Sequence, residues 1–176
     1  MRFYTVGHST RPLEELIALL DDAAVRQVAD VRTIPRSRRN PQFDSDVLAP
    51  ALERHGIGYR HLRELGGLRP RRRDVPDAVN GFWQNRSFHN YADYALTDDF
   101  RRGLERLEAL AHDGPCAMLC AEAVWWRCHR RIIADYLLAR GRTVFHILGP
   151  GAMRPADPTP GAVVEPDGRV LYPAPA

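Results

Sequence analysis

The chain has 176 residues, a formal net charge of +3 and 44% hydrophobic residues, which is enough length and apolar content for one sizeable core. No stretch of about twenty apolar residues is present, and Met1 leads directly into a strand-like segment, so we expect a cytoplasmic protein without a membrane span or secretory signal. Three cysteines are too few and too irregularly spaced for a disulfide framework.

The first half of the chain alternates apolar runs with amphipathic segments. In the first helix, apolar residues recur at i, i+3, i+4 and i+7, namely at Leu13, Leu16, Ile17 and Leu20. The predicted elements are a strand at 3–6, a helix opened by Thr10 and Pro12, a strand at 25–31, a helix over 48–55 closed by Gly56, and a strand at 57–62.

The second half continues the same alternation. Thr97 is predicted to cap a helix that ends at Gly114, because Asp98 and Asp99 favour the first turn. Two further apolar strands at 116–120 and 143–148 flank a helix from about Cys128 to Arg140. This pattern predicts an α/β fold with a mainly parallel central sheet flanked by helices on both faces.

Two segments depart from this alternation. Residues 66–90 form a long connection that we interpret as a loop or lid within an α/β domain over 1–150. Residues 151–176 form a tail rich in Pro and Gly. Its apolar stretches at 162–165 and 169–172 flank Pro166-Asp167-Gly168 and predict a small hairpin.

Polar residues follow nearly every predicted strand. In parallel sheets, ligands bind outside the carboxyl ends of the strands. Each of these residues alone fits a structural role, but their common location at one sheet edge predicts a shared pocket. The residues at or near these strand ends are His8 and Ser9, Asp30 and Arg32, His61 and Glu64, and Cys120 and Glu122, with His146 inside the last strand.

The thiols at the junction of strand 116–120 and the following helix are the leading candidates for chemistry. Cys120 leaves the strand and Cys128 lies at the helix start, among Arg127, His129 and Arg130. Backbone N–H groups and positive charge at such a position lower a thiol pKa. Burial as packing residues is the alternative, and it is favoured for Cys116 inside the strand.

An anionic ligand is predicted from the arginines, which supply all 25 positive charges of a chain without lysine. Their planar guanidinium groups suit phosphate and carboxylate. Pro35 and Pro41 stiffen a basic loop after the second strand, although Arg32 could instead pair with Asp30 or Glu122. The predicted substrate-binding residues are Ser9, Asp30, Arg32, Arg36, Arg38, Asn40, Arg127, Arg130 and, as a stacking aromatic, Tyr91. Packing of Tyr91 onto the core is the alternative.

Several motifs together resemble the prokaryotic family catalogued as domain of unknown function 488. They are Tyr4-Thr5-Val6-Gly7-His8-Ser9-Thr10, Asp30-Val31-Arg32, Ser37-Arg38-Arg39-Asn40-Pro41-Gln42-Phe43, Leu65-Gly66-Gly67, Tyr91-Ala92-Asp93-Tyr94, Cys120-Ala121-Glu122 and Cys128-His129-Arg130. The resemblance runs from about Phe3 to Leu148 and implies a family without an activity.

Two other likenesses suggest chemistry. The order of Asp30-Val31-Arg32, Cys120, a helix and Gly141-Arg142-Thr143-Val144 is similar to rhodanese and related phosphatases, in which loop N–H groups cradle an anion around the thiolate. The loop after Cys120 departs from that pattern, because it has two tryptophans and no glycine. Cys128-His129-Arg130 also resembles the reactive motif of alkylguanine transferases.

These observations predict a cysteine-dependent transferase or hydrolase that acts on a phosphate-, sulfur- or nucleotide-containing anion. Cys120 is the expected nucleophile, Glu122 or His8 the acid and base, and Cys128 and His129 complete the catalytic set. The alternative is a non-catalytic module that binds nucleotide or nucleic acid. No cofactor is expected. Zinc held by Cys120, Cys128, His129 and His8 is disfavoured because closely spaced ligand pairs are missing.

Overall fold

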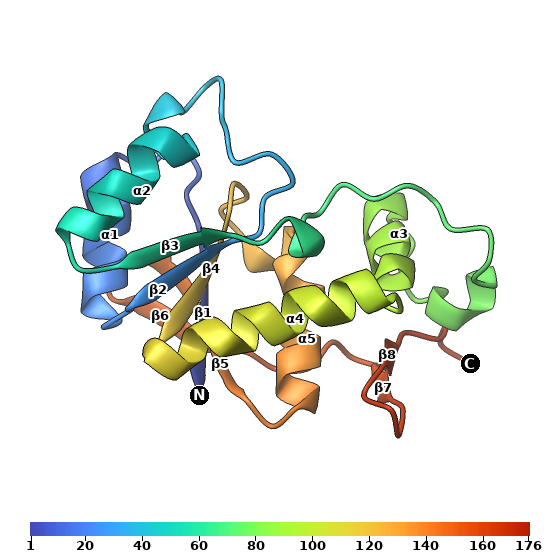
Figure 1. The fold of residues 1–176 in the computed structure, drawn as a ribbon. Coiled ribbons are helices and arrows are strands. Elements are labelled where there is room, and N and C mark those ends of the chain that lie inside the picture. The colour runs from blue at the N-terminus through green and yellow to red at the C-terminus, as the bar shows by residue number, and fades with distance from the viewer.

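A computed structural model of residues 1–176 has a central six-stranded sheet in the order β3-β2-β4-β1-β5-β6 (Figure 1). The first five strands along the chain are parallel, and β6 pairs antiparallel with β5. The prediction of a mainly parallel sheet is therefore confirmed. The strands are β1 (Arg2–Gly7), β2 (Gln27–Asp30), β3 (Gly58–His61), β4 (Cys116–Cys120), β5 (Thr143–Gly149) and β6 (Ala152–Pro155).

Helices cover both faces of this sheet, as predicted. One buried cluster joins α1 and α2 to Tyr4, Val6 and Val28, and a second joins α3, α4 and α5 to Phe3 and Met118. No helix combines the length and apolar character needed to cross a membrane. The helices are α1 (Leu13–Asp22), α2 (Ser45–Arg54), α3 (Arg86–Tyr94), α4 (Asp98–Leu110) and α5 (Arg130–Ala139).

The alternation of side chains along β4 decides where its cysteines point. Ala117 and Leu119 belong to the cluster on the α1–α2 face, whereas Cys116, Met118 and Cys120 belong to the cluster on the α4–α5 face. Cys120 is the last residue of the strand on the face that carries α5. Its thiol is therefore directed toward the segment that leads into that helix.

The strand order creates a crevice near the middle of the sheet. β4 lies between β2 and β1, although both precede it in the chain. The connection from β1 to β2 carries α1 on one face, and the connection from β4 to β5 carries α5 on the other. Because the two connections leave the sheet in opposite directions, a space remains at the carboxyl ends of β1 and β4, where ligands bind in such folds.

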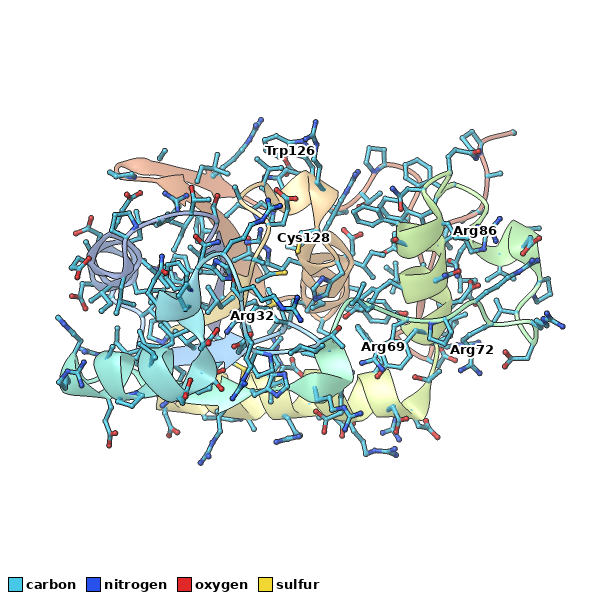
Figure 2. All side chains as sticks on the ribbon, turned by 90° about the horizontal axis from the view of Figure 1, so that it is seen from above. Arg32, Arg69, Arg72, Arg86, Trp126 and Cys128 are labelled. Carbon is cyan, nitrogen blue, oxygen red and sulfur yellow. The ribbon has the colours of Figure 1, made fainter.

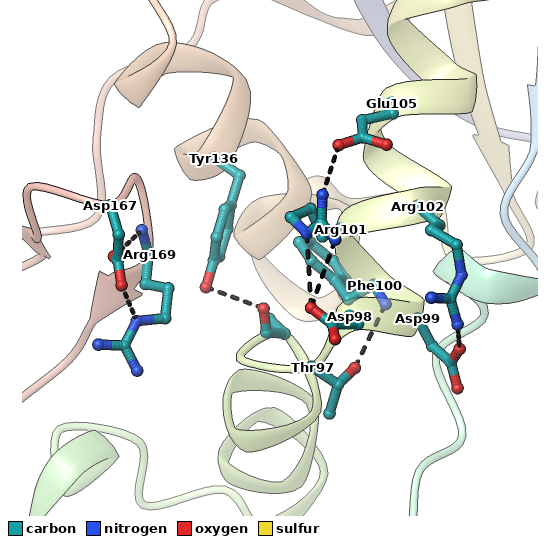
Figure 3. Close-up of polar contacts among 11 residues, drawn as sticks. Thr97, Asp98, Asp99, Phe100, Arg101, Arg102, Glu105, Tyr136, Asp167 and Arg169 are labelled. Atoms are coloured by element: carbon teal, nitrogen blue, oxygen red, sulfur yellow. Dashed lines mark hydrogen bonds and ion pairs between the residues drawn. The ribbon is translucent and has the colours of Figure 1, made fainter.

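The N-terminus of α4 has the predicted cap, shown in Figure 3. Thr97 Oγ1 accepts a hydrogen bond from the Phe100 N–H at 3.3 Å, and Asp98 and Asp99 occupy the first turn. The Tyr136 hydroxyl of α5 donates to the Ala95 carbonyl at 3.2 Å. The end of α3, the start of α4 and the middle of α5 therefore meet at this place.

The long connection at 66–90 contains more structure than the sequence predicted. A 3-10 turn forms at Asp77–Asn80, and α3 begins at Arg86, where the Asn85 side chain accepts hydrogen bonds from two backbone N–H groups. The sequence of α3 did not reveal its helical period, because its buried face consists of two tyrosines, an alanine and an aspartate rather than aliphatic residues. Edge strand β6 was also missed, since all four of its residues are exposed.

The C-terminal hairpin is present as β7 (Val163–Val164) and β8 (Val170–Leu171). It packs against the helical face through Val170 and Tyr172, which both belong to the buried cluster of α3, α4 and α5. The Tyr172 hydroxyl donates to Asp135 Oδ2 on α5 at 2.8 Å. The end of the chain is therefore attached to the helix that starts beside the cysteines.

Candidate functional site

A cleft of about 750 Å³ lies at the carboxyl ends of β1, β2 and β4. Figure 2 looks onto this edge of the sheet, with Cys128 and Arg32 near the centre and Arg69, Arg72 and Arg86 beside α3. The structure thus brings several of the polar strand ends into one cleft, whereas the predicted Asp30, His61, Glu64 and His146 do not line it. Its lining includes seven of the predicted residues from these strand ends and the helix start: His8, Ser9, Arg32, Cys120, Glu122, Cys128 and His129.

The cleft floor depends on the close approach of β1 and the chain that leaves β4. The sheet ladder continues past both strands, because the N–H groups of His8 and Ser9 donate to the carbonyls of Cys120 and Ala121 at 2.9 and 3.0 Å. A Cβ atom at Gly7 would lie 1.8 Å from the Glu122 carbonyl oxygen. Only glycine allows the chain to cross the end of β1 in this way.

Cys128 has the surroundings of an activated thiol. Arg130 Nε donates a hydrogen bond to its Sγ at 3.2 Å, and His129 Nδ1 lies 3.6 Å from the same sulfur. The side chain is 4% exposed and reaches the cleft just before the first turn of α5. Positive charge and the helix terminus both favour a thiolate at this position.

The imidazole of His129 is oriented by a second contact. Its Nε2 lies 2.8 Å from the Val31 carbonyl oxygen. A carbonyl only accepts hydrogen bonds, so Nε2 carries a proton, and Nδ1 is the ring nitrogen that faces Cys128. A Cβ atom at Gly67 would lie 2.5 Å from Nδ1, so this glycine provides the space that the ring occupies.

The three thiols differ in their ionisation. Burial opposes ionisation of Cys128, but a hydrogen bond from Cys120 and the charges of His129 and Arg130 lower its pKa well below the usual thiol value. The same hydrogen bond, followed by burial, raises the pKa of Cys120 well above that value. Burial raises the pKa of Cys116 to about 12. Of the two neighbouring thiols, Cys128 is therefore the one that ionises more readily.

Arg32 is held by an internal ion pair, which is the alternative that the sequence left open. Its Nε and Nη2 donate to the two carboxylate oxygens of Asp30 at 2.9 and 2.7 Å, and Nη2 also donates to the Phe43 carbonyl. Asp30 is fully buried, and its Oδ2 also accepts from the Tyr59 hydroxyl at 2.5 Å. Arg32 therefore orders the start of the basic loop while its remaining nitrogen lies at the cleft wall.

Arg130 also points inward. Its Nη2 donates to the Glu122 carbonyl at 2.5 Å while Nε donates to Cys128, and the residue is 1% exposed. The guanidinium thus lies behind the thiol and links it to the chain leaving β4. Its charge acts on Cys128 more directly than on a ligand in the open cleft.

Other arginines face the cleft without a protein partner. Arg36, Arg38 and Arg127 are exposed and line it, together with Arg39, which the sequence did not single out. Asn40 lies in the same loop, where its N–H donates to Ser37 Oγ at 3.1 Å. The structure therefore separates two kinds of arginine, those buried in the wall and those free to meet an anion.

The remaining candidates support this arrangement or lie at its rim. His8 Nδ1 donates to the Ser9 carbonyl at 2.8 Å, and its Nε2 lies 3.3 Å from Arg32 Nη1. Burial lowers the pKa of His8. Tyr91 is fully buried behind the site with its ring centroid 5.0 Å from that of His129, and Glu122 is exposed at the rim.

The sequence did not identify every residue that shapes the cleft. Leu68, Ser87 and Phe88 form the wall opposite the basic loop, and Gly67 supports His129. The Gly66-Gly67 pair was a usable signal, because consecutive glycines mark a close approach of the backbone to another group. Ser87 and Phe88 could not be placed without α3.

The residues present could also hold a metal ion. Cys120, Cys128 and His129 each offer one ligand atom, and these atoms all lie within 4.8 Å of one another. The sequence named these three residues as possible zinc ligands but disfavoured them, because the two cysteines are not a closely spaced pair.

A family model described as "Domain of unknown function DUF488" matches residues 12–137. No curated protein and no solved structure matches the chain.

Proposed function

Because this chain belongs to the DUF488 family, whose description carries no activity, we propose a function from its own residues: a cysteine-dependent enzyme that acts on an anionic substrate. Cys128 is its nucleophile. The sequence favoured Cys120 for that role, but the contacts of Arg130 and His129 are made with Cys128.

One observation carries the proposal. The Cys128 sulfur opens to a basic cleft, with Arg130 Nε at 3.2 Å and His129 Nδ1 at 3.6 Å. A thiol paired with an oriented imidazole and a guanidinium is the arrangement that activates a cysteine nucleophile. A thiol kept only for packing needs neither partner.

The same geometry suggests how the groups share the reaction. His129 accepts the thiol proton at Nδ1, and the thiolate attacks an electrophilic phosphorus, sulfur or carbon atom of the substrate. A bond from sulfur to that atom forms while the bond to the leaving group breaks, and the leaving group takes the proton back from His129. The thiol of Cys120 stabilises the anion before attack, and Arg36, Arg38 and Arg127 bind the substrate's negative charge.

A binding module for nucleotide or nucleic acid remains the second candidate. The unpartnered arginines of the basic loop favour it, as does Phe88 in the opposite wall, where a base could stack. Such a module would use the cleft without needing an ionised Cys128, so thiol chemistry separates the two functions.

Alkylation with two matched reagents tests the proposal. Iodoacetate carries a negative charge and iodoacetamide does not, so a basic cleft should favour iodoacetate at Cys128 relative to its effect on a free thiol. We expect this preference to fall in Arg127→Ala and Arg36→Ala and to persist in Arg101→Ala, which changes an exposed arginine on α4. Slow labelling of Cys128 with no preference for the anionic reagent would instead favour the binding module.

A further inference from the structure

We propose that Cys120, Cys128 and His129 bind a thiophilic divalent transition metal ion such as Zn²⁺, with one coordination position open to the cleft. The inference does not depend on the proposed catalysis, because it rests on the relative positions of three donor atoms. It uses the same thiol, so a bound ion would also control access to Cys128.

The spacing of the donor atoms suits tetrahedral coordination. The three atoms lie within 4.8 Å of one another, and His129 Nδ1 is 3.6 Å from Cys128 Sγ. A zinc ion with bonds of about 2.3 Å to sulfur and about 2.0 Å to nitrogen holds its ligand atoms about 3.5–3.8 Å apart. The 3.6 Å contact already matches this spacing, and the distances to Cys120, which are at most 4.8 Å, would shorten when an ion binds.

Hydrogen bonds from neighbouring groups orient the proposed metal ligands and favour the protonation states that metal binding requires. The Val31 carbonyl accepts a hydrogen bond from His129 Nε2, and a histidine held in this way presents Nδ1 as a metal ligand. Arg130 Nε donates to Cys128 Sγ, which stabilises the deprotonated sulfur that a metal requires. All three donor residues line the cleft, so an ion has a path to the site.

The fourth position belongs to a ligand from solution. His8 is the nearest candidate that the sequence suggested, but its Nδ1 is used by the Ser9 carbonyl and its Nε2 faces Arg32. No other histidine, cysteine or carboxylate joins the group. Three protein ligands and one open position are typical of catalytic rather than structural zinc sites, and the nearby arginines would favour an anion at that position.

The sequence argued against zinc because short ligand pairs are missing, and the fold explains why that argument fails here. The end of β4 and the start of α5 bring Cys120 beside Cys128 and His129 across the segment 121–127. Tertiary structure thus replaces the short turn that joins ligands in common zinc motifs.

Metal titration of the full chain tests the site. The chelator-treated protein is titrated with Co²⁺, whose thiolate charge-transfer and d–d absorption reports sulfur ligation and tetrahedral geometry, and Zn²⁺ affinity is measured by competition with a chromogenic chelator. We expect one ion per chain. Loss of one hydrogen bond to a metal-ligating residue weakens metal binding by about 10- to 100-fold. Cys120→Ala removes a ligand itself, so it should weaken Zn²⁺ binding by more than about 100-fold.

Cys116→Ala is the matched control, because Cys116 faces the same side of β4 but lies outside the donor group. It should bind one Co²⁺ ion with unchanged absorption, and circular dichroism checks that every variant is folded. Absence of thiolate absorption in the wild-type protein, or the same Zn²⁺ affinity in folded Cys120→Ala, overturns the metal site. The proposed catalytic thiol is tested separately by iodoacetate labelling of metal-free protein, so either idea can fail without the other.

Discussion

At the scale of single residues, the site depends on which atoms face each other rather than on which residue types are present. Cys120 and Cys128 occupy equally suggestive places in the sequence, yet Arg130 turns back from the first turn of α5 to donate to Cys128. His129 reaches the same sulfur because the Val31 carbonyl holds the far side of its ring. These orientations favour ionisation of Cys128 over that of Cys120.

The three thiols should therefore react in a fixed order. We expect Cys128 to be alkylated by iodoacetate below the free-thiol pKa of about 8.5, because its pKa is lowered, while Cys120 and Cys116 react only after unfolding. Mass spectrometry of peptides labelled between pH 5 and 9 measures the three rates. If Cys120 is labelled fastest, the reactive thiol is the one at the end of β4 and not Cys128.

Gly67 offers a test of the position of His129. A Cβ atom there would lie 2.5 Å from Nδ1, so Gly67→Ala must displace the ring from Cys128. We expect alkylation of Cys128 to slow by about ten-fold, equivalent to about 1.4 kcal/mol of activation free energy. Gly149→Ala is the matched control, because a Cβ atom there meets nothing within 4 Å. Equal rates in the two variants would show that the imidazole does not assist the thiol.

His146 should make stability depend on pH. Burial, aided by the charges of Arg130 and Arg154, lowers its pKa from 6.5 to about 4. Between these values the unfolded chain binds a proton that the folded chain does not, so stability is complete above about pH 6.5 and falls as the pH drops toward 4. The loss between pH 7 and 5 is about 2 kcal/mol.

Urea unfolding at pH 7 and pH 5 measures this effect. His146→Gln should reduce the difference between the two pH values, leaving a smaller one from His8, whose pKa is also lowered by burial. The same pH dependence in wild type and variant would mean that His146 is protonated equally in both states.

At the scale of elements, the sequence predicted those with a strong apolar period and missed those without one. β4 has the predicted limits, and the Thr97 cap of α4 was correctly placed, since buried strands and capped amphipathic helices carry local signals. α3 has the capping residue Asn85 but no stripe of aliphatic residues, and β6 is an exposed edge strand. Their positions are decided by tertiary contacts.

The C-terminal hairpin is one such contact, and its attachment to α5 can be measured. Tyr172→Phe removes the hydroxyl that donates to Asp135 Oδ2 at 2.8 Å inside the protein. We expect the free energy of unfolding to fall by about 1–3 kcal/mol, the cost of a buried polar group that loses a partner. Tyr4→Phe is the control, since Tyr4 is buried but its hydroxyl makes no hydrogen bond within the chain. Equal stabilities would show that Asp135 does not hold the tail.

At the scale of the whole molecule, the cleft joins groups from both halves of the chain. The sequence predicted this meeting because parallel strands end at one edge, but it could not separate the arginines that face solution from those that turn inward. Arg32 and Arg130 were expected to clamp an anion, and the structure places both in the wall. The arginines that line the cleft, are exposed and have no ion-pair partner include Arg36, Arg38 and Arg127.

Binding of inorganic phosphate should follow this division. We expect phosphate to raise the melting temperature, since a ligand that binds only the folded state stabilises it. Calorimetry should show that Arg127→Ala weakens phosphate binding by about 1.5–3 kcal/mol, the scale of a charge-assisted hydrogen bond. Arg101→Ala is the control, and equal affinities in the two variants would place the anion elsewhere.

Arg32→Ala should behave differently, because it leaves the buried carboxylate of Asp30 without its charged partner. We expect a loss of stability of about 3–5 kcal/mol, the usual effect of removing one member of a buried ion pair. A stable Arg32→Ala protein that no longer binds phosphate would show that Arg32 contacts the ligand instead of supporting the fold.

The place of β4 between two earlier strands has a consequence for the order in which the chain can fold. Phe3 pairs with Cys116, a separation of 116 − 3 = 113 residues, and contacts this distant form slowly. While the ribosome is still making residues before β4, β1 and β2 have no neighbour in the gap between them, and their inner edges stay open to wrong partners. The strand that closes this gap also carries Cys120 and leads to Cys128, so a nascent chain cannot bring the two thiols together at the cleft before β4 has entered the sheet.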